Sequence, residues 1–310
     1  MIDFSVIIST YNRYKSLKDT LDSLLAQESN GDFDYEILVV DNNSKDKTKE
    51  LVQSYVQKFN GRLRYLFEPR QGQSLALNLA IKKVKGEIIA FTDDDVILDK
   101  AWLLNLLQCF QKYACDGVGG RVLPLYGKNT PKWFKDNKNL LGGPIVYHDY
   151  GEATKLNDSL IMEPFVGANM AFRRKCFNEF GLFNTKLGPG TGSLGGDTEF
   201  FNRLTNAKKL YYCGEALVWH PVDKERANLK YIARWCIAEG RYLATVEYKK
   251  VSNKAIYYWR IPRYLIRDVA EDFIFLLTYL LFNKRKFLKQ WKTLFYTVGR
   301  IVEYKNSLGV

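Results

Sequence analysis

The sequence predicts an α/β fold in which a mostly parallel sheet is flanked by helices. Two periodicities alternate in the first hundred residues: short runs of β-branched and aromatic residues, and longer stretches with apolar side chains every three or four positions. Strand, helix and strand in repeated succession require parallel strands joined by crossover helices. The chain has 310 residues, 46% of them apolar, which is enough to bury a sizeable core and excludes a mostly disordered protein.

Four runs are expected to be buried strands, at residues 4–9, 35–40, 63–67 and 87–92. The helical faces expected between them are formed by Leu17, Leu21, Leu24 and Leu25, by Leu51, Val52, Tyr55, Val56 and Phe59, and by Leu77, Ala80, Ile81 and Val84. Residues 117–157 are rich in loop formers and give no firm element. From Lys224 onward the chain is expected to be helical, basic and aromatic. We therefore divide it into a first domain of residues 1–222 and a helical C-terminal region of residues 223–310.

Composition narrows the class of protein. The 46 Lys and Arg against 34 Asp and Glu leave a net charge of +12, which favours an anionic partner. The five cysteines are scattered without a CxxC pair, so a reducing cytosol is expected rather than a disulfide framework or zinc module. The start of the chain has no basic region before its short apolar run and does not resemble a signal peptide. The longest uncharged apolar stretch, residues 273–282, is too short to cross a bilayer as a helix.

Polar residues follow each of the four predicted strands. They are Thr10, Tyr11, Asn12 and Arg13 after the first strand, Asp41, Asn42, Asn43 and Ser44 after the second, Arg70, Gln71 and Gly72 after the third, and Asp93, Asp94 and Asp95 after the fourth. Ligands of parallel sheets bind beyond the carboxyl ends of the strands. The sequence therefore predicts one binding site at this edge of the sheet.

A nucleotide is one ligand that this edge could bind. Strand, turn, helix and an acidic residue ending the second strand follow the Rossmann order, but residues 9–13 lack the GxGxxG glycines, and the chain has no GxxxxGK[ST] loop. Asp41 can still accept hydrogen bonds from a ribose or a base. It can equally be an ordinary turn residue, because Asp-Asn-Asn-Ser is common turn chemistry. Taken alone, the residues leave both interpretations open.

The run Asp93, Asp94, Asp95 is the most distinctive feature of the sequence. Three carboxylates at the end of an apolar strand repel one another unless a cation or an exposed loop relieves the repulsion. Mg²⁺ or Mn²⁺ suits this arrangement, because one or two carboxylate oxygens hold the ion while phosphates and water complete its shell. A solvated acidic turn is the alternative.

Five motifs in order carry a resemblance to a known family. They are VIISTYNR at residues 6–13, VVDNNS at 39–44, TDDD at 92–95, GANM at 167–170 and GDTE at 196–199. Together they resemble family 2 glycosyltransferases of the GT-A fold, which have a Rossmann-like central sheet, and the resemblance covers about residues 2–222. It implies an inverting enzyme that moves a sugar from a nucleotide diphosphate to an acceptor hydroxyl in one displacement.

The resemblance also implies roles for individual residues. The metal site for Mn²⁺ or Mg²⁺ matches Asp93, Asp95 and His220. The nucleotide pocket matches Thr10, Tyr11, Asn12, Arg13, Asp41, Asn43, Asp93 and Asp94, and we add Arg70, Gly72, Ser74 and Asn78 as candidates because they lie at or near the start of a predicted helix whose amides suit phosphate. Gly167, Ala168 and Asn169 match a wall near the donor sugar and the acceptor. Asp197 matches the catalytic base, with Glu199 as possible support.

Physical chemistry supports these roles but leaves alternatives. A nucleoside diphosphate leaves only when a metal or cation meets its developing charge, and the acceptor hydroxyl needs a base away from the metal. Ser74 can instead be a plain N-cap, and Asp197 and Glu199 can simply stabilise a helix dipole. We favour catalysis for Asp197 because a glycine-rich, lid-like loop, residues 188–196, precedes it. Gly196 departs from the family, since many relatives have an acidic residue there.

The C-terminal region combines basic and aromatic residues. One helical face is formed by Phe287, Trp291, Leu294, Phe295 and Val298, with Lys286, Lys289, Lys292 and Arg300 largely elsewhere. This composition is typical of a helix that lies in a membrane interface, while packing against the first domain or a second subunit of an oligomer is the alternative. We expect a cytoplasmic protein that is peripheral to the inner face of the cell membrane.

The expected donor is a nucleotide-diphosphate sugar, with UDP as the expected nucleotide, and the expected acceptor is a saccharide or a lipid-linked sugar in cell-surface polysaccharide or glycolipid synthesis. Arg234 and Trp235 resemble part of the QxxRW signature of processive synthases, but Tyr231 replaces the glutamine, so transfer of one sugar fits better.

A sugar-nucleotide nucleotidyltransferase would need a glycine-rich, lysine-bearing loop after the first strand. A basic nucleic-acid binder would need a pattern such as RNP or helix-turn-helix, and neither pattern is found.

Overall fold

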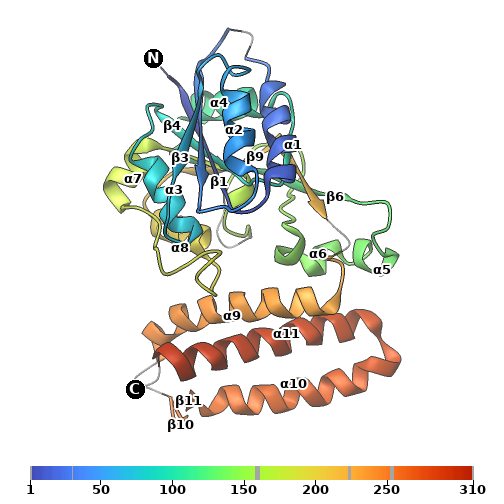
Figure 1. Ribbon diagram of the computed structural model, residues 1–310. Coiled ribbons are helices and arrows are strands. Elements are labelled where there is room, and N and C mark those ends of the chain that lie inside the picture. The colour runs from blue at the N-terminus through green and yellow to red at the C-terminus, as the bar shows by residue number, and fades with distance from the viewer. Residues whose placement is uncertain (1, 30, 158–160, 223–224, 252–254, 309–310) are drawn as a thin grey trace. The chain divides into compact units, whose positions relative to one another are not determined.

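The computed structural model describes residues 2–29, 31–157, 161–222, 225–251 and 255–308 (Figure 1). The chain divides into two compact units. The first contains Met1–Leu125, Val146–Gly190 and Gly196–Pro221, and the second contains Tyr126–Ile145, Thr191–Gly195 and Val222–Val310. The second unit, called here the helical unit, therefore takes in two segments that precede the C-terminal helices in sequence. Residues 223 and 224, where the predicted C-terminal region begins, lie outside the described residues.

A nine-stranded mixed sheet is the centre of the first unit. Its strands are β1 (Phe4–Thr10), β2 (Tyr35–Asp41), β3 (Leu63–Phe67), β4 (Ile88–Thr92), β5 (Ile97–Leu98), β6 (Gly117–Tyr126), β7 (Lys155–Leu156), β8 (Met170–Arg173) and β9 (Leu210–Val222). The order is β3-β2-β1-β4-β8-β6-β9-β5, and β7 pairs with β9. The strands β1 to β4 are parallel, as the sequence predicts, whereas β8 pairs antiparallel with β4 and with β6.

The register of the parallel strands brings their carboxyl ends together. Thr10 at the end of β1 is paired with Asp41 at the end of β2, and Asp41 is paired with Phe67 at the end of β3. On the other side of β1, Ile8 is paired with Thr92, so the acidic run begins beside the last residues of β1. The loops that follow these strands must therefore start at one edge of the sheet.

Helices cover both faces of this sheet in the first unit (Figure 1). They are α1 (Tyr14–Leu25), α2 (Thr48–Val56), α3 (Gln73–Ile81), α4 (Trp102–Tyr113), α7 (Arg174–Phe180) and α8 (Gly196–Leu204), with the 3₁₀ turn η2 (Gly167–Asn169) before β8. Successive strand residues point to opposite faces. Accordingly Ile8 packs with α1 and α4, while Ile7 packs with α3, α7 and α8.

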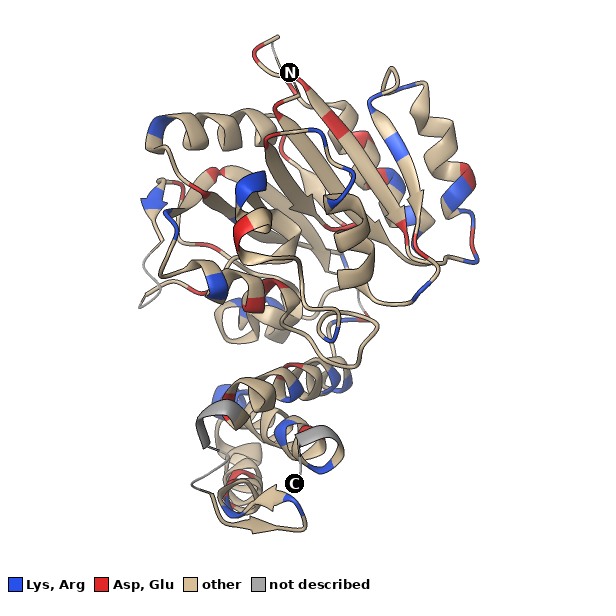
Figure 2. Ribbon diagram, turned by 90° about the vertical axis from the view of Figure 1, so that its left-hand side faces the viewer, with Lys and Arg blue, Asp and Glu red and all other residues tan. Residues whose placement is uncertain are grey.

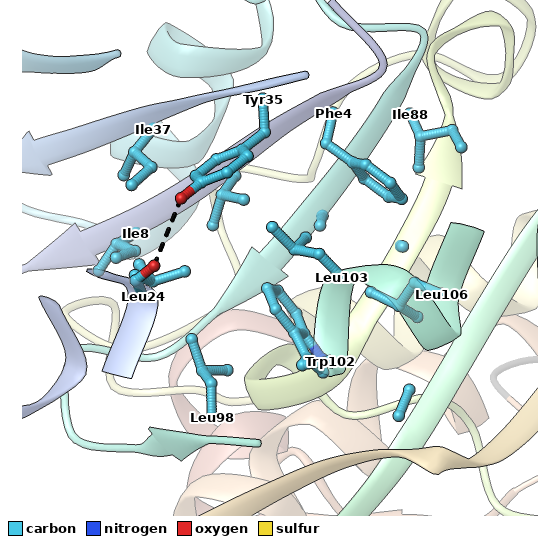
Figure 3. Packing of buried hydrophobic residues seen from close by; sticks show 14 of the residues in the cluster. Phe4, Ile8, Leu24, Tyr35, Ile37, Ile88, Leu98, Trp102, Leu103 and Leu106 are labelled. Carbon is cyan, nitrogen blue, oxygen red and sulfur yellow. Dashed lines mark hydrogen bonds between the residues drawn. The ribbon is translucent and has the colours of Figure 1, made fainter. Parts of the chain in front are cut away.

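Figure 3 shows the first of these cores from close by. Trp102 and Leu106 of α4 and Leu24 of α1 are fully buried there beside Ile8 and Tyr35 of the sheet. The Tyr35 hydroxyl donates a hydrogen bond of 3.4 Å to the carbonyl of Leu24, which satisfies the buried phenol. This packing fixes the strands whose ends carry the polar loops.

The helical unit contains α5 (Lys132–Lys135), α6 (Lys138–Leu141), the 3₁₀ turn η1 (Gly143–Ile145), α9 (Leu229–Val251), β10 (Tyr257–Tyr258), β11 (Ile261–Pro262), α10 (Arg263–Phe282), α11 (Lys284–Glu303) and the π-turn η3 (Tyr304–Leu308). The helices α9 and α11 approach closely at two glycines. A Cβ on Gly240 would lie 2.2 Å from the carbonyl oxygen of Tyr296, and one on Gly299 would lie 2.2 Å from that of Ile237. Only glycine allows the two backbones to meet in this way.

The apolar stripe of α11, for which the sequence left membrane contact and protein packing open, is partly packed inside the helical unit. Leu294 is buried, and Trp291 and Phe295 are partly buried with their rings in tilted contact. The indole Nε1 of Trp291 donates to the carbonyl of Leu229. An amphipathic pattern predicts a covered face but does not say whether protein or lipid covers it. Within the described residues, every helix is too short or too polar to count as a membrane-spanning candidate.

Candidate nucleotide and metal site

Asp93, Asp95 and His220 bring potential metal ligands together at the carboxyl edge of the sheet. One atom from each lies within 4.8 Å of the others. His220 Nε2 is 3.3 Å from Asp95 Oδ1 and 3.9 Å from Asp93 Oδ2. The strand pairing explains the meeting, because β5 follows the acidic run directly and pairs with β9 so that Ile97 lies opposite Trp219, the neighbour of His220.

The imidazole of His220 is oriented for a ligand role. It is 2% exposed, and its Nδ1 lies 3.1 Å from the carbonyl oxygen of Pro221. A carbonyl can only accept, so Nδ1 carries the proton in the neutral ring, and Nε2 is the nitrogen that faces the two carboxylates. Two carboxylates and one imidazole suit Mn²⁺ or Mg²⁺, and the imidazole favours Mn²⁺. The donor set therefore fits the expected divalent cation.

The ionised carboxylates of the acidic run repel one another when no cation balances their charge. Burial raises the pKa of Asp93 to about 7, and the charge of Asp95 adds to this rise. Burial also raises the pKa of Asp94 to about 6, although the nearby Arg13 acts against it. Crowded carboxylates favour the protonated form, and a bound cation reverses that preference. A cation bound at this cluster would therefore favour loss of the carboxyl protons.

Arg13 supplies a positive charge at the start of α1. Its Nη1 lies 3.2 Å from Asp94 Oδ1 and 2.9 Å from Asp95 Oδ2, and its side chain is half exposed. Asp94 is therefore turned toward Arg13 rather than into the Asp-Asp-His group. In the predicted nucleotide pocket, Thr10 is buried at the end of β1 and Tyr11 is exposed.

Asp41 and its turn hold the loop after β2. Asp41 Oδ1 accepts a hydrogen bond from the amide of Ser44, and Oδ2 accepts one from the hydroxyl of Tyr65, each of 2.8 Å. Asn43 adopts a left-handed φ of 68°, and its Nδ2 donates to the carbonyl of Pro69. The turn interpretation of Asp41 is therefore present in the structure. A carboxylate has about four acceptor positions, so these bonds still leave Asp41 able to accept from a ligand.

Asn12 ties the loop after β1 to the loop after β2. Its amide donates to Ser44 Oγ at 2.9 Å, and its Oδ1 accepts from the amide of Lys45 at 2.7 Å. Its φ of 54° is left-handed, a conformation that asparagine tolerates better than most residues. This predicted site residue therefore shapes the pocket wall through backbone contacts.

Asn42 is a central residue of the edge that the sequence analysis did not select. Its Nδ2 donates to the carbonyls of Glu68 and Arg70, its Oδ1 accepts from the amide of Gly72, and its own amide donates to the carbonyl of Thr10. Asn42 therefore joins the end of β1, through its backbone amide, to the loop after β3, through its side chain. Its place among four polar residues was visible in the sequence, but its partners were not.

The candidates near the start of α3 are largely occupied by other parts of the protein. Glu68 holds the guanidinium of Arg70 through two hydrogen bonds of 2.8 Å. Ser74 Oγ donates to the carbonyl of Leu187, so Ser74 is not the N-cap. Asn78 exchanges two hydrogen bonds with the backbone of Phe183. Both Ser74 and Asn78 therefore fasten residues 183–187 to α3, whereas Gly72, with a φ of 141°, shapes the turn before it.

Asp197 begins α8 and faces the turn η2. Its Oδ2 accepts from the amide of Gly167 at 2.9 Å, and its Oδ1 accepts from the amide of Thr198 at 2.8 Å. Burial raises the pKa of this carboxyl, although these backbone donors oppose the rise. Glu199 has a different environment, since it pairs with Arg203 at 3.0 Å one turn along the helix. Among the described residues Glu199 forms an ion pair and Asp197 forms none, so the two carboxylates differ in their surroundings.

The motif at residues 167–169 supports the site mostly from inside the core. Asn169 is fully buried, accepts from Trp102 Nε1, and donates to the carbonyls of Arg121 and Ala216. Ala168 is also buried, and its carbonyl accepts from Thr92. Of the three residues predicted to form a wall near the sugar, only Gly167 lies next to a candidate catalytic group.

The glycine-rich loop before Asp197 is held at several points. The carbonyl of Pro189 accepts from the amide of Gln73 in the first unit. Within the helical unit, Arg241 Nη1 donates to the carbonyl of Gly192, and Leu194 donates its amide to the carbonyl of Ala238. A lid-like loop was predicted, and its residues 191–195 are anchored on α9, a contact that no sequence pattern indicated.

The fold and this edge together define the class. A Rossmann-like, mostly parallel sheet with antiparallel strands added on one side, flanked by helices and carrying acidic ligands at its carboxyl edge, is a GT-A type α/β fold. Residues 5–181 match the family model described as Glycosyl transferase family 2. That match covers more than half of the chain, so the chain belongs to glycosyl transferase family 2. The family predicted from the five motifs is thereby confirmed.

Two curated relatives show how far the similarity extends. The poly(ribitol-phosphate) beta-N-acetylglucosaminyltransferase TarS of Staphylococcus aureus is 30% identical over 154 residues, which are 47% of this chain and 26% of TarS. The succinoglycan biosynthesis protein ExoM of Rhizobium meliloti is 26% identical over 236 residues, which are 76% of this chain and 72% of ExoM. The chain thus spans about a quarter of TarS and most of ExoM.

Solved structures confirm the fold. The mannosyltransferase PcManGT from Pyrobaculum calidifontis, in complex with GDP-Man and Mn²⁺, superposes with a TM-score of 0.63 at 18% identity, covering 97% of this chain and 86% of that one. The structure of S. aureus TarS 1-349 with UDP-GlcNAc gives a TM-score of 0.57 at 15% identity, covering 96% and 91% of the two chains. At these identities the similarity establishes the GT-A fold alone.

Proposed function

We propose that this protein is an inverting, metal-dependent glycosyltransferase that moves one sugar from a nucleotide-diphosphate sugar to an acceptor hydroxyl. The observation that carries the proposal is the convergence of Asp93, Asp95 and His220 at the carboxyl edge of the sheet, within 4.8 Å of one another. Residues 1–222 would form the catalytic domain. The donor complexes of TarS and PcManGT, with UDP-GlcNAc and GDP-Man, support a nucleotide sugar as donor, and UDP is our expected nucleotide.

The residues at the edge divide the work of binding the donor. Asp93, Asp95 and His220 would hold Mn²⁺ or Mg²⁺, which as a Lewis acid balances the charge that develops on the diphosphate. Asp41 keeps acceptor capacity for a ribose or base, and the loop that Asn12 and Asn42 fix supplies a preorganised wall. Arg13, half exposed beside Asp95, can reorient toward a phosphate when a cation takes its place against the carboxylates.

Asp197 is the proposed base. Inversion requires the acceptor hydroxyl to attack the anomeric carbon from the face opposite the diphosphate, and a carboxylate must take the hydroxyl proton. Its two backbone donors, the amides of Gly167 and Thr198, hold the carboxylate in one orientation. The raised pKa makes it a better proton acceptor than an ordinary aspartate once it is ionised. Glu199, paired with Arg203, would support α8 rather than take the proton.

The biological setting follows from the relatives only as a proposal. TarS is named for a poly(ribitol-phosphate) product and ExoM for succinoglycan biosynthesis, so we propose a saccharide or lipid-linked acceptor in cell-surface polysaccharide or glycolipid synthesis. Such acceptors favour a protein that works on the cytoplasmic side and contacts the membrane peripherally. The rival nucleotidyltransferase function gains no support from any feature of the site.

Thermal unfolding with a panel of donors tests this proposal. Purified protein is heated with UDP-, GDP- or dTDP-sugars, each with and without Mn²⁺ or Mg²⁺. One donor class should raise the melting temperature by several degrees only when metal is present, because ligands that bind the native state stabilise it by mass action. The stabilising donor is then used to measure transfer and the anomeric configuration of the product. A retained configuration, or stabilisation independent of metal, would count against the mechanism.

A further inference from the structure

Helix α10 exposes an apolar face that the helical unit leaves uncovered. Residues 273–282 contain no charged side chain. Five of them recur at helical spacing and are exposed: Phe273 at 53%, Ile274 at 62%, Leu277 at 54%, Leu280 at 54% and Leu281 at 81%. Phe275 and Phe282 are exposed as well, and within residues 273–282 only Leu276 is buried. An uncovered apolar face of this extent on one helix indicates an interaction surface.

A basic cleft adjoins the end of this helix. It has a volume of about 490 Å³ and is lined by Asn139, Leu140, Asn283, Arg285, Lys286 and Lys289, all in the helical unit. Phe282, which is 82% exposed, is joined directly to Asn283 of the cleft. Asn283 also fixes the corner, since its side chain accepts from the amide of Lys286 and caps α11. The exposed apolar run of α10 therefore ends where the basic cleft begins.

The basic residues at the cleft are not neutralised by ion pairs among the described residues. Within the described part of the chain, Lys284, Arg285 and Lys289 form no ion pair, and Lys286 lies over the ring of Tyr279. Residues 223–310 contain 18 Lys and Arg against 8 Asp and Glu, a net charge of +10 out of the +12 of the whole chain. Figure 2 shows Lys and Arg residues, together with some Asp and Glu, on the helices of the unit. The partner of the surface should therefore be anionic.

We propose that the exposed face of α10 and the basic cleft beside it bind an anionic lipid surface. The uncharged run has ten residues and is about 15 Å long as a helix, half the thickness of the hydrocarbon layer, so it can lie in the interface but not cross it. Apolar side chains would enter the acyl boundary, while the cleft would take a phosphate headgroup. Apolar face and adjacent positive charge are both needed, which a purely apolar protein partner would not require.

This surface differs from the one that the sequence suggested. The stripe on α11 is packed against other helices, whereas α10, whose pattern is less amphipathic, presents the open face. Lipid binding itself does not depend on the enzymatic activity. Its use in bringing a lipid-linked acceptor to the enzyme does rest on the proposed function, and the two are separated by the experiment below.

Co-sedimentation of the full chain with vesicles tests the proposal. Vesicles of phosphatidylcholine alone are compared with vesicles that also contain phosphatidylglycerol, at low and at high salt. Binding should require the anionic lipid and weaken at high salt, because counterions screen the cleft. Free glycerol phosphate should not compete strongly, since it offers nothing to the apolar face.

Two variants separate the parts of the surface, each with a matched control. Arg285→Glu/Lys286→Glu/Lys289→Glu should weaken vesicle binding by at least about tenfold, whereas Lys49→Glu/Lys58→Glu/Lys112→Glu, with the same change of net charge on exposed residues of the first unit, should not. Leu281→Ser/Phe282→Ser should also lose binding. Leu156→Ser/Ile161→Ser, which changes two exposed apolar residues of the first unit, should keep it.

Three results would overturn the proposal. Equal binding to neutral and anionic vesicles would remove the role of the cleft, and equal loss in the control variants would remove the role of this surface. If light scattering shows that the wild type is a dimer and Leu281→Ser/Phe282→Ser is a monomer, with vesicle binding unchanged, a second copy of the chain covers the face instead. Release of UDP in the absence of vesicles is measured in parallel, so that failure of the enzyme and failure of lipid binding are told apart.

Discussion

The carboxyl edge of the sheet and the helical unit place charge in opposite ways. At the edge, Asp93, Asp94 and Asp95 are gathered against one Arg and one His, and residues 1–222 as a whole carry 28 Lys and Arg against 26 Asp and Glu, a net charge of +2. In residues 223–310 the surplus is +10 and much of it is exposed. A cation bound at the edge would therefore stabilise its acidic cluster. An anionic partner would stabilise the exposed basic residues of the C-terminal helices.

The two regions also differ in what holds them together. Loops at the edge are joined by polar contacts of Asn12, Asn42 and Asp41 with neighbouring backbone. The helices α9 and α11 instead meet through the backbone contacts of Gly240 and Gly299. Substitutions at the edge should therefore change chemistry with little change in stability, and substitutions in the helix contact should do the reverse.

Of the variants that test this comparison, Asp95→Ala should lower the catalytic rate most. The variant loses a ligand of the proposed metal site and should lower kcat by about 10⁴-fold, in line with the several kcal/mol that a bound metal supplies. Its melting temperature without metal should be unchanged or higher, because one repelling carboxylate is gone. Transfer assays with added Mn²⁺ and thermal unfolding without it check both parts. Asp19→Ala, at an exposed position on α1, is the control, and full activity of Asp95→Ala in EDTA would exclude the metal mechanism.

Asp197→Asn should have the next largest effect. It keeps the shape of the side chain but cannot take a proton, so kcat should fall by about 10²- to 10³-fold while donor affinity stays near that of the wild type. Isothermal titration with donor and metal, together with single-turnover transfer, separates the two quantities. Glu199→Gln should lose less, because the Glu199 carboxylate is engaged with Arg203. If the two variants lose equal activity, the assignment of the base to Asp197 is wrong.

Gly240→Val should lower the stability of the helical unit rather than the activity of the edge. The added side chain would overlap the carbonyl of Tyr296, so the helical unit should lose about 1–3 kcal/mol of stability. The metal-dependent shift of the melting temperature caused by the donor should survive, because the edge is in the other unit. Hydrogen exchange on α9 and α11 would locate the loss. Val246→Ala, at an exposed position of α9, should be close to neutral, and a loss of donor binding in Gly240→Val would show that the units depend on one another.

The parallel half of the fold was predictable because its strands are short, β-branched and followed by polar loops. Asp93 and Asp95 could be selected for the same reason, since each lies where a buried strand ends. His220 could be selected only through the family resemblance, because it meets Asp95 through the pairing of β5 with β9, more than a hundred residues apart. A local pattern contains no information about such a pairing.

Several predicted site residues have tertiary partners that the sequence could not indicate. Ser74, Asn78 and Asn169 have the hydrogen-bonding groups that a sugar or nucleotide would use, but backbone carbonyls and amides of distant segments occupy them. Asn42 was passed over although it joins the end of β1 to the loop after β3. The stripe on α11 likewise has the composition of a membrane helix but is partly covered by protein. In each case the residue type indicated what the side chain could bind, and the residues packed around it determine what it contacts.

The smallest expected effect is on the melting temperature of Asp197→Asn. It measures how much stability the protein loses by burying the carboxylate of Asp197. Burial raises the pKa of Asp197, so its ionised form carries a cost in the folded protein at neutral pH. Asp197→Asn removes that cost and should melt at the same temperature as the wild type or a few degrees higher at neutral pH. The difference should fade as pH falls toward the unfolded pKa of about 3.9, because the wild-type group is then neutral in both states. Melting temperatures across this range check the sign. A variant that is less stable at neutral pH would mean that the amides of Gly167 and Thr198 stabilise the carboxylate more than burial opposes it.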